Sequence, residues 1–218
     1  MNVEIWSDVA CPWCYLGKRR FAAALEGFEH RDDVTIRWRS FELDPQAPRE
    51  RDVDAVTYLA GKYGMTPEEA RARQEHLEGL AAADGLELHL DRSRGGNTFD
   101  AHRLLALAAD RGLQDEAKER LMRAYHTDGE PIADHDVLAR AATDAGLEPD
   151  EVADVLAGDR YADAVREDEH TAAQFGINGV PFFVVDRTMA LSGAQTPQVL
   201  GELLRQAWER RPAPAISD

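Results

Sequence analysis

The hydrophobic positions near the start of the chain change their spacing twice. Residues 3–6 form a short apolar run that predicts a buried strand. Between residues 12 and 28 the apolar positions recur at helical spacing, and their stripe consists of Phe21, Ala24, Leu25 and Phe28. Residues 34–41 alternate with period two and predict a second strand. The chain therefore begins as strand, helix and strand.

A break rich in proline and charged residues at positions 44–52 precedes a long run of helical patterns. Thr66, Pro67 and Glu69 form a helix-start signature, with an N-cap, a first-turn proline and a glutamate that reaches back to the cap. This helix is expected to run to about Asp84 and to stop at Gly85. Alanine-rich stripes within 101–109 and 137–145 predict further helices.

The end of the chain returns to a mixed pattern. Residues 161–175 predict a helix, 182–185 a short apolar strand, and 188–191 its hairpin partner. A last helix is expected from Thr196-Pro197 to about Arg210, followed by a loose tail at 212–214. This order predicts an α/β fold in which one sheet domain, residues 1–43 and 159–218, is interrupted by a helical insertion, residues 44–158.

Charge and composition narrow the choice of partners. The formal net charge of −16 argues against nucleic acid and anionic membranes, because both bind a positive surface. No apolar run approaches the roughly 18–20 residues that span a membrane. The first residues also lack the basic and apolar regions of a secretory signal. We therefore expect a cytoplasmic protein with no membrane or nucleic-acid partner.

The chain has only two cysteines, Cys11 and Cys14, and they follow the first predicted strand as Cys-Pro-Trp-Cys. Two thiols at this spacing indicate a redox pair or a metal site rather than a disulfide scaffold. A helix that begins here favours negative charge at its N-terminus, which activates Cys11 as an exposed attacking thiolate. Cys14 lies seven residues before Phe21, on the inward stripe, and is the expected resolving thiol.

Two motifs together resemble the DsbA family of thiol–disulfide oxidoreductases. They are Cys-Pro-Trp-Cys and Gly179-Val180-Pro181, which opens the late strand. The resemblance implies a thioredoxin fold with a helical insertion and a cis proline, Pro181, beside the cysteines. Without it, Pro181 would be read as an ordinary trans proline at a strand start. Residues 7–17 and 97–104 resemble the FrnE-like branch of the family, and the likeness covers essentially the whole chain.

The resemblance implies an enzyme that exchanges thiols and disulfides through a mixed disulfide on Cys11. Its substrates would be protein or small-molecule thiols and disulfides. It would need no cofactor beyond its own redox-active disulfide, with glutathione as a candidate co-substrate. Oxidation and reduction of the substrate are both compatible with the motif, and the sequence carries no signal for the oligomeric state.

Several other residues are candidates for contact with the substrate. Pro12 and Trp13 lie between the cysteines, and the backbone of Val180 is free to pair with an extended peptide. Asn97, Phe99, His102 and Arg103 either line the cleft at a helix start, or cap and pack that helix. Asp8 is either a turn residue or an influence on proton transfer. Glu4 is either a buried proton acceptor or a residue of the sheet surface.

Three other functions stay open. A glutathione-dependent isomerase of the 2-hydroxychromene-2-carboxylate isomerase type would not need a redox pair. A peptide-binding, chaperone-like module would work without either cysteine. A metal site is disfavoured, since two cysteines supply half of the four ligands that zinc takes. The remaining histidines show no shared metal-ligand spacing; they are His30, His76, His89, His126, His135 and His170. We therefore expect no metal.

Overall fold

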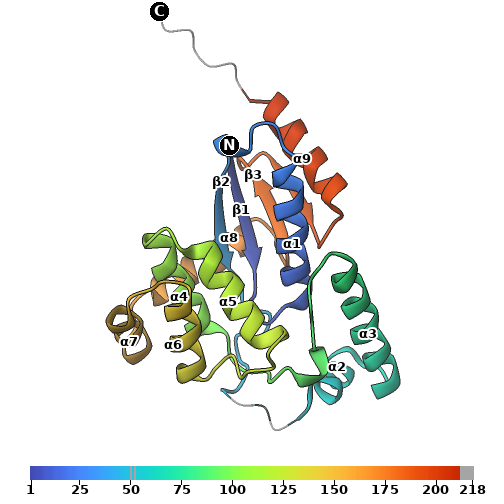
Figure 1. The fold of residues 1–218 in the computed structure, drawn as a ribbon, viewed down its shortest axis with the longest axis vertical. Coiled ribbons are helices and arrows are strands. Elements are labelled where there is room, and N and C mark those ends of the chain that lie inside the picture. Colours follow the sequence, from blue (N-terminus) through green and yellow to red (C-terminus); the bar gives the residue numbers. More distant parts are fainter. Residues whose placement is uncertain (50, 52, 212–218) are drawn as a thin grey trace, which may run out of the picture.

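A four-stranded sheet in the order β2-β1-β3-β4 forms the centre of the computed structural model, which describes residues 1–49, 51 and 53–211 (Figure 1). Strand β1 (Asn2–Ser7) pairs in parallel with β2 (Thr35–Ser40) and antiparallel with β3 (Phe182–Val185). Strand β4 (Met189–Ser192) is the hairpin partner of β3. The two ends of the chain thus build one sheet.

Helices cover both faces of this sheet. On one face α1 (Pro12–Glu26) packs beside α9 (Pro197–Glu209), over Val3 and Ile5 of β1. On the other face α8 (Ala162–Gln174) packs near Trp6. Because successive side chains of a strand point to opposite faces, Glu4 shares the α8 face with Trp6. The sheet therefore separates Glu4 from the helix that carries the two cysteines.

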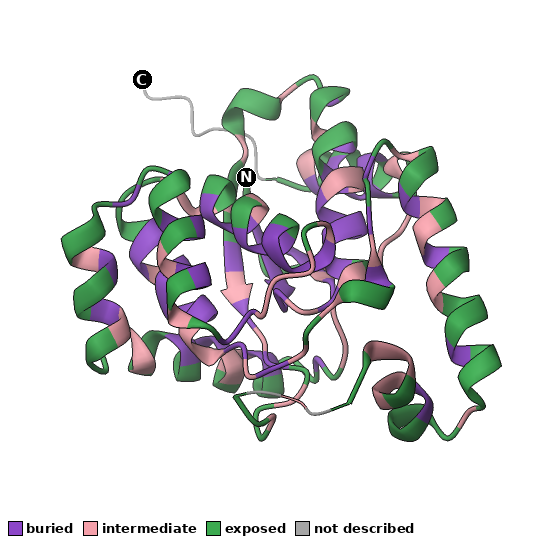
Figure 2. Cartoon of the chain, turned by 60° about the horizontal axis from the view of Figure 1, so that its bottom comes forward, coloured by how far each residue is buried: buried purple, intermediate pink, exposed green. Residues whose placement is uncertain are grey.

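The remaining helices lie between β2 and α8 along the chain and gather at one end of the sheet (Figure 1). They are α2 (Ala55–Tyr63), α3 (Pro67–Ala83), α4 (Phe99–Asp110), α5 (Gln114–His126), α6 (His135–Asp144) and α7 (Pro149–Ala157). Two short 3-10 helices, Arg31–Asp33 and Leu90–Arg92, complete the structure. Buried residues lie on the inward sides of the helices (Figure 2).

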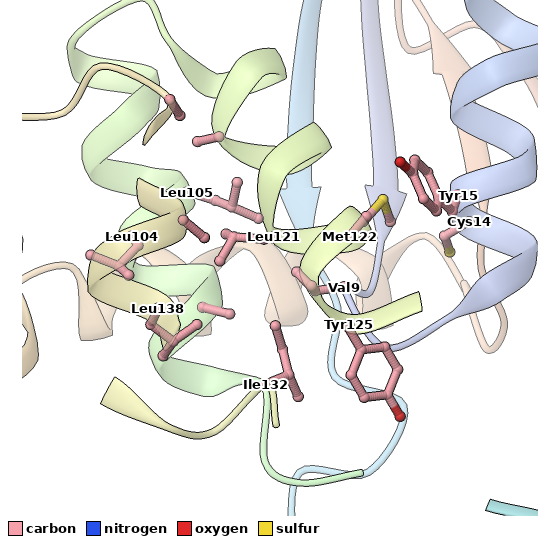
Figure 3. Close-up of a cluster of buried hydrophobic side chains, with 14 of the residues drawn as sticks. Val9, Cys14, Tyr15, Leu104, Leu105, Leu121, Met122, Tyr125, Ile132 and Leu138 are labelled. Carbon is pink, nitrogen blue, oxygen red and sulfur yellow. The ribbon is translucent and has the colours of Figure 1, made fainter. Parts of the chain in front are cut away.

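The largest hydrophobic core joins these helices to the start of α1. Leu104, Leu121 and Leu138 form its centre, and it continues through Met122 to Cys14 (Figure 3). The division into domains at residues 43 and 158 stays a prediction, since this core contains residues from both sides of it. The thiol pair is thus buried by the helical part of the chain as well as by the sheet.

The α/β fold class and all four predicted strands are confirmed, with bounds that differ by one residue at most ends. The capping box is also confirmed: Thr66 and Glu69 exchange hydrogen bonds of 3.2 and 2.8 Å. The predicted tail at 212–214 lies outside the described residues. None of the helices in the described ranges is long and apolar enough to cross a membrane.

Candidate active site

The two cysteines occupy the first turn of α1, directly after the loop that follows β1. Cys11 is the N-cap residue, and Pro12 holds the first helical position. Proline suits this position because its ring presets a helical φ and its missing N–H would have no partner there. The backbone N–H of Cys14 donates to the Cys11 carbonyl at 3.0 Å, which closes the first turn. Both thiols are free, so the structure represents the dithiol form.

Both thiols are nearly inaccessible. Cys11 is 4% exposed and Cys14 is fully buried. The expectation of an exposed Cys11 is therefore wrong, because Cys11 belongs to the hydrophobic core that helices α3, α4 and α5 share with the start of α1. The difference between the two sulfurs persists, however, since Cys11 lines a cavity and Cys14 is not among the described residues that do. A substrate in the cavity would reach Cys11 first.

Strand β3 brings a second segment against Cys11. The Val180–Pro181 peptide bond is cis. The Cys11 Sγ lies 3.7 Å from the Val180 carbonyl oxygen and donates a weak hydrogen bond to it. Pro181 also packs closely on α1: a Cβ added to Gly17 would lie 2.8 Å from the Pro181 Cγ. Gly17 therefore allows the late strand to approach the helix, a requirement that sequence reasoning missed.

A cavity of about 430 Å³ opens beside Cys11. Pro12 and Trp13 form one wall, and Tyr58 and Tyr63 of α2 belong to the opposite wall. Trp13 is 42% exposed, although most large apolar side chains of the described residues are buried. The other strongly exposed apolar side chains on the lining are Leu43, Val53 and Tyr63. The cavity is suited to a ligand with an apolar portion.

Basic side chains on the lining give the far wall a positive charge. They are Arg51, Lys62 and Arg73. Arg51 lies over the Tyr58 ring, 3.7 Å from the centroid, and its guanidinium lowers the pKa of Asp44 through a 2.6 Å hydrogen bond. Lys62 lies 5.6 Å from the same ring. Asp8 and Asp44 also line the cavity, and Asp44 balances the charge of Arg51, so Lys62 and Arg73 are the lining cations without a carboxylate partner among the described residues.

Asp8 lies on the cavity lining but is almost fully buried. Its carboxylate accepts hydrogen bonds from the Leu43 backbone N–H at 2.8 Å and the Ala10 N–H at 3.3 Å, and pairs with the His102 Nε2 at 3.3 Å. Burial acts to raise the pKa of Asp8, but the bond to His102 and the backbone bonds outweigh it and lower that pKa. Asp8 is thus a turn residue that also places a charge near Cys11.

The predicted residues at the start of α4 lie behind the cavity. The lining identified among the described residues includes Thr98 but not Asn97, Phe99 or His102. Thr98 is the N-cap residue of α4, and the Asn97 Oδ1 just before it accepts the Phe99 backbone N–H at 2.9 Å. Phe99 lies 4.2 Å below the guanidinium of Arg166. The structure therefore favours the capping and packing alternatives for this segment.

The two thiols interact too strongly to ionise independently. A hydrogen bond with Cys14, burial and the charge of Cys14 raise the pKa of the Cys11 thiol well above its usual range. The backbone N–H of Cys14 acts in the opposite direction. The buried neighbouring sulfur thus acts against the activation that the helix N-terminus is expected to give Cys11.

Comparison with known proteins agrees with this site. The sequence profile of the DSBA-like thioredoxin domain matches residues 2–205. The chain belongs to the DsbA-like thioredoxin domain family. It is therefore an oxidoreductase whose redox centre is a disulfide, and it acts on thiol or disulfide substrates. The narrower FrnE-like assignment stays a prediction.

Solved structures show the same fold for the whole DsbA-like chain. A probable DsbA oxidoreductase from Streptomyces coelicolor is 46% identical, with a TM-score of 0.94 over 100% of this chain and 94% of that one. The cytosolic disulfide reductase DsbM from Pseudomonas aeruginosa, solved with GSH, has a TM-score of 0.67 at 19% identity, over 96% and 100% of the two chains. A 2-hydroxychromene-2-carboxylate isomerase has a TM-score of 0.68 at 16% identity, over 97% and 100%.

The DsbA-like site also contains residues of α5 that sequence reasoning did not select. His126 is fully buried, its Nε2 lies 3.0 Å from the Val9 carbonyl oxygen, and burial lowers its pKa to about 4. Lys118 lies two turns earlier and is also fully buried. The available signal was their spacing of eight residues, which places them on one side of α5 with Met122 between them.

Glu4 is not a proton acceptor for the thiols. Its carboxylate binds Arg39 and Arg187 on the α8 side of the sheet. Hydrogen bonds from Arg187 outweigh the effect of burial and, together with Arg39, lower the pKa of Glu4 to about 2. Glu4 is buried, at 8% exposure, on the side of the sheet away from the thiols, so neither alternative describes it fully. In the described ranges no group of three or more His, Cys, Asp or Glu side chains is placed to hold a metal ion.

Proposed function

We propose that the protein reduces disulfides of small acidic molecules or peptides in the cytoplasm through Cys11 and Cys14. The observation that carries the proposal is the position of Cys11, whose sulfur lines the cavity beside the Val180 carbonyl while Cys14 is buried behind it. The Cys11 thiol loses its proton to solvent as its sulfur attacks one substrate sulfur, and the other substrate sulfur leaves as a thiolate. Cys14 then attacks Cys11, which releases the second substrate thiolate and oxidises the pair.

The environment of the dithiol supports reduction rather than oxidation of the substrate. A strongly oxidising pair owes its potential to a stabilised reduced form, in which the attacking cysteine is a thiolate of low pKa. Here burial and Cys14 raise the pKa of Cys11 instead. This direction supports a reducing role in the proposal.

The lining of the cavity supports an acidic substrate with an apolar portion. Trp13 and the tyrosines of α2 offer flat apolar surfaces, and Lys62 and Arg73 offer positive charge. A glutathione mixed disulfide has carboxylates that would meet this charge, and a fold relative was solved with GSH. Glutathione is accordingly our first candidate for a co-substrate. The backbone of Val180 would hold a peptide substrate as an added strand.

Trapping the mixed disulfide tests the function. With a glutathionylated peptide as substrate, Cys11→Ser should abolish reduction. Cys14→Ser should accumulate a glutathione adduct on Cys11, located by mass spectrometry of tryptic peptides. Full activity of the Cys11→Ser variant would refute the proposal, and so would an adduct confined to Cys14 in the wild type.

The isomerase and chaperone alternatives have no specific observation in their favour. Likeness to the isomerase structure at 16% identity shows the fold alone. Both alternatives predict activity without the second thiol. Glutathione-dependent isomerisation, or suppression of aggregation, by Cys14→Ser protein at the wild-type level would move the assignment to one of them.

A further inference from the structure

Lys118 of α5 is a buried ammonium group beside the thiol pair. Its side chain has no exposed surface, and its Nζ makes no hydrogen bond with any residue of the described ranges. The charge lies over the Trp38 ring, 5.1 Å from the centroid. Met122, one turn later on α5, faces Tyr15 and Cys14 in the shared core (Figure 3). An unpaired charge in such a core is costly, which is typical of a functional group.

The charged neighbours of Lys118 come from α1, from the loop after β1 and from α5 itself: Cys14, Lys18, Asp8 and Asp115. Asp115 already accepts a 2.9 Å hydrogen bond from Lys18. Asp8 is engaged by a histidine and two backbone N–H groups. Cys14 is therefore the neighbour that is able to gain a charge opposite to that of Lys118.

Lys18, a second buried lysine, has a structural role and serves for comparison. Lys18 of α1 donates to Asp115 and Glu119, both at 2.9 Å, so its charge is balanced. Lys118 has no such carboxylate partner in the described ranges. Burial lowers the pKa of Lys118 to about 8, although the charges of Cys14 and Asp8 act to raise it. An amine with this pKa gains and loses a proton readily near neutral pH.

We infer that Lys118 is the proton partner of Cys14, a role that rests on the proposed dithiol chemistry. When a mixed disulfide on Cys11 is resolved, the Cys14 thiol gives its proton to the Lys118 amine. The Cys14 sulfur then bonds to the Cys11 sulfur, and the bond from Cys11 to the substrate sulfur breaks. The substrate leaves as a thiolate and takes a proton from water. When an external thiol later reduces the pair, Cys14 leaves as a thiolate and recovers its proton from the Lys118 ammonium.

The ionisation of Cys14 tests this role without any substrate. In a Cys11→Ser background, Cys14 is the only thiol, so its thiolate absorbance is measured directly against pH. Lys118→Met should raise the midpoint of thiolate formation by at least about one pH unit, because the thiolate loses its positive neighbour. Lys118→Gln should cause a shift in the same direction. Lys118→Met should fold, since it removes an unpaired charge and leaves no buried partner unsatisfied.

Lys18→Met is the matched control, because it removes a buried lysine of α1 that already has carboxylate partners. It should shift the midpoint less than Lys118→Met does. An unchanged midpoint in both Lys118 variants, or an equal shift in Lys18→Met, would overturn the role of Lys118. Failure of the proposed function would appear instead as activity retained by Cys11→Ser, so the two outcomes are distinguishable.

With Cys11 restored, stopped-flow release of product from the mixed disulfide gives a second readout. Lys118→Met should slow this release most below the wild-type midpoint and little at high pH. A uniform slowing at every pH would indicate a structural effect and would count against proton exchange.

Discussion

The two walls of the cavity are built in different ways. The wall at the start of α1 is held tightly: Cys11 touches the Val180 carbonyl, and Pro181 fits against Gly17. The wall from α2 and α3 is held loosely, since Ala60 is the only buried residue of α2 and α3 has three. The contrast teaches that the reactive sulfur sits on a rigid element, whereas the surface that would select the substrate is able to adjust.

Replacement of Cys11, on the rigid wall, should have the largest effect on activity. Cys11→Ser should lower the rate of disulfide reduction by at least about 10³-fold, because no other group supplies the nucleophile. The rate is measured with a glutathionylated peptide, and Cys11→Ala serves as a second variant. A decrease in rate of less than tenfold would mean that Cys11 is not the nucleophile.

Disturbing the contact between α1 and Pro181 is the next test. Gly17→Ala should destabilise the fold by about 1–3 kcal/mol, because the new Cβ overlaps the proline ring. Urea unfolding measures this change. Gly79→Ala in α3 is the matched control: an added Cβ meets nothing within 4 Å there, so alanine should stabilise the helix by up to about 1 kcal/mol. Equal behaviour of the two variants would contradict the tight fit.

The stability of the fold at acidic pH tests the ion pairs of Glu4 on the α8 face of the sheet. The pKa of Glu4 is lowered from 4.5 to about 2, so its ion pairs stabilise the folded state above pH 4.5, and this contribution is lost as the pH falls towards 2. Its size is on the order of 3 kcal/mol, since each pKa unit corresponds to about 1.4 kcal/mol. Glu4→Gln should therefore weaken the fall in stability between these pH values, as followed by urea unfolding, and should leave disulfide reduction unchanged. A loss of activity would connect this face to the thiols.

Charges on the loose wall should give the smallest effect. Lys62→Ala combined with Arg73→Ala should raise the KM for a glutathionylated substrate a few-fold with kcat unchanged, because each exposed charge contributes about 0.2–1 kcal/mol. The effect should fade at high salt. Arg71→Ala is the control: Arg71 lies on α3, as Arg73 does, but is not among the described residues that line the cavity. An equal change in KM for a neutral disulfide would argue against charge recognition.

Local patterns predicted most of the elements and the reactive pair. The capping box at Thr66, the alternation in 34–41 and the helical stripe after Pro12 all depend on neighbours within a few residues. The same local patterns did not predict how deeply the site residues are buried. Cys11 sits at a helix start, which favours an open position, but distant helices bury it. For Asn97, Phe99 and His102 the local pattern left a place in the cleft and a capping or packing role both open, and none of the three is among the described residues that line the cavity.

Local sequence patterns are sufficient to predict the order of strands and helices, the Cys-Pro-Trp-Cys pair and, through its motifs, the family. These features depend on hydrophobic period, caps and adjacent residues. Only the tertiary structure decided how deeply the thiols lie, which side of the sheet holds Glu4, and which charges surround Cys14. Lys118 is 104 positions away from Cys14 along the chain. Burial and long-range charge depend on such contacts, and no local pattern encodes them.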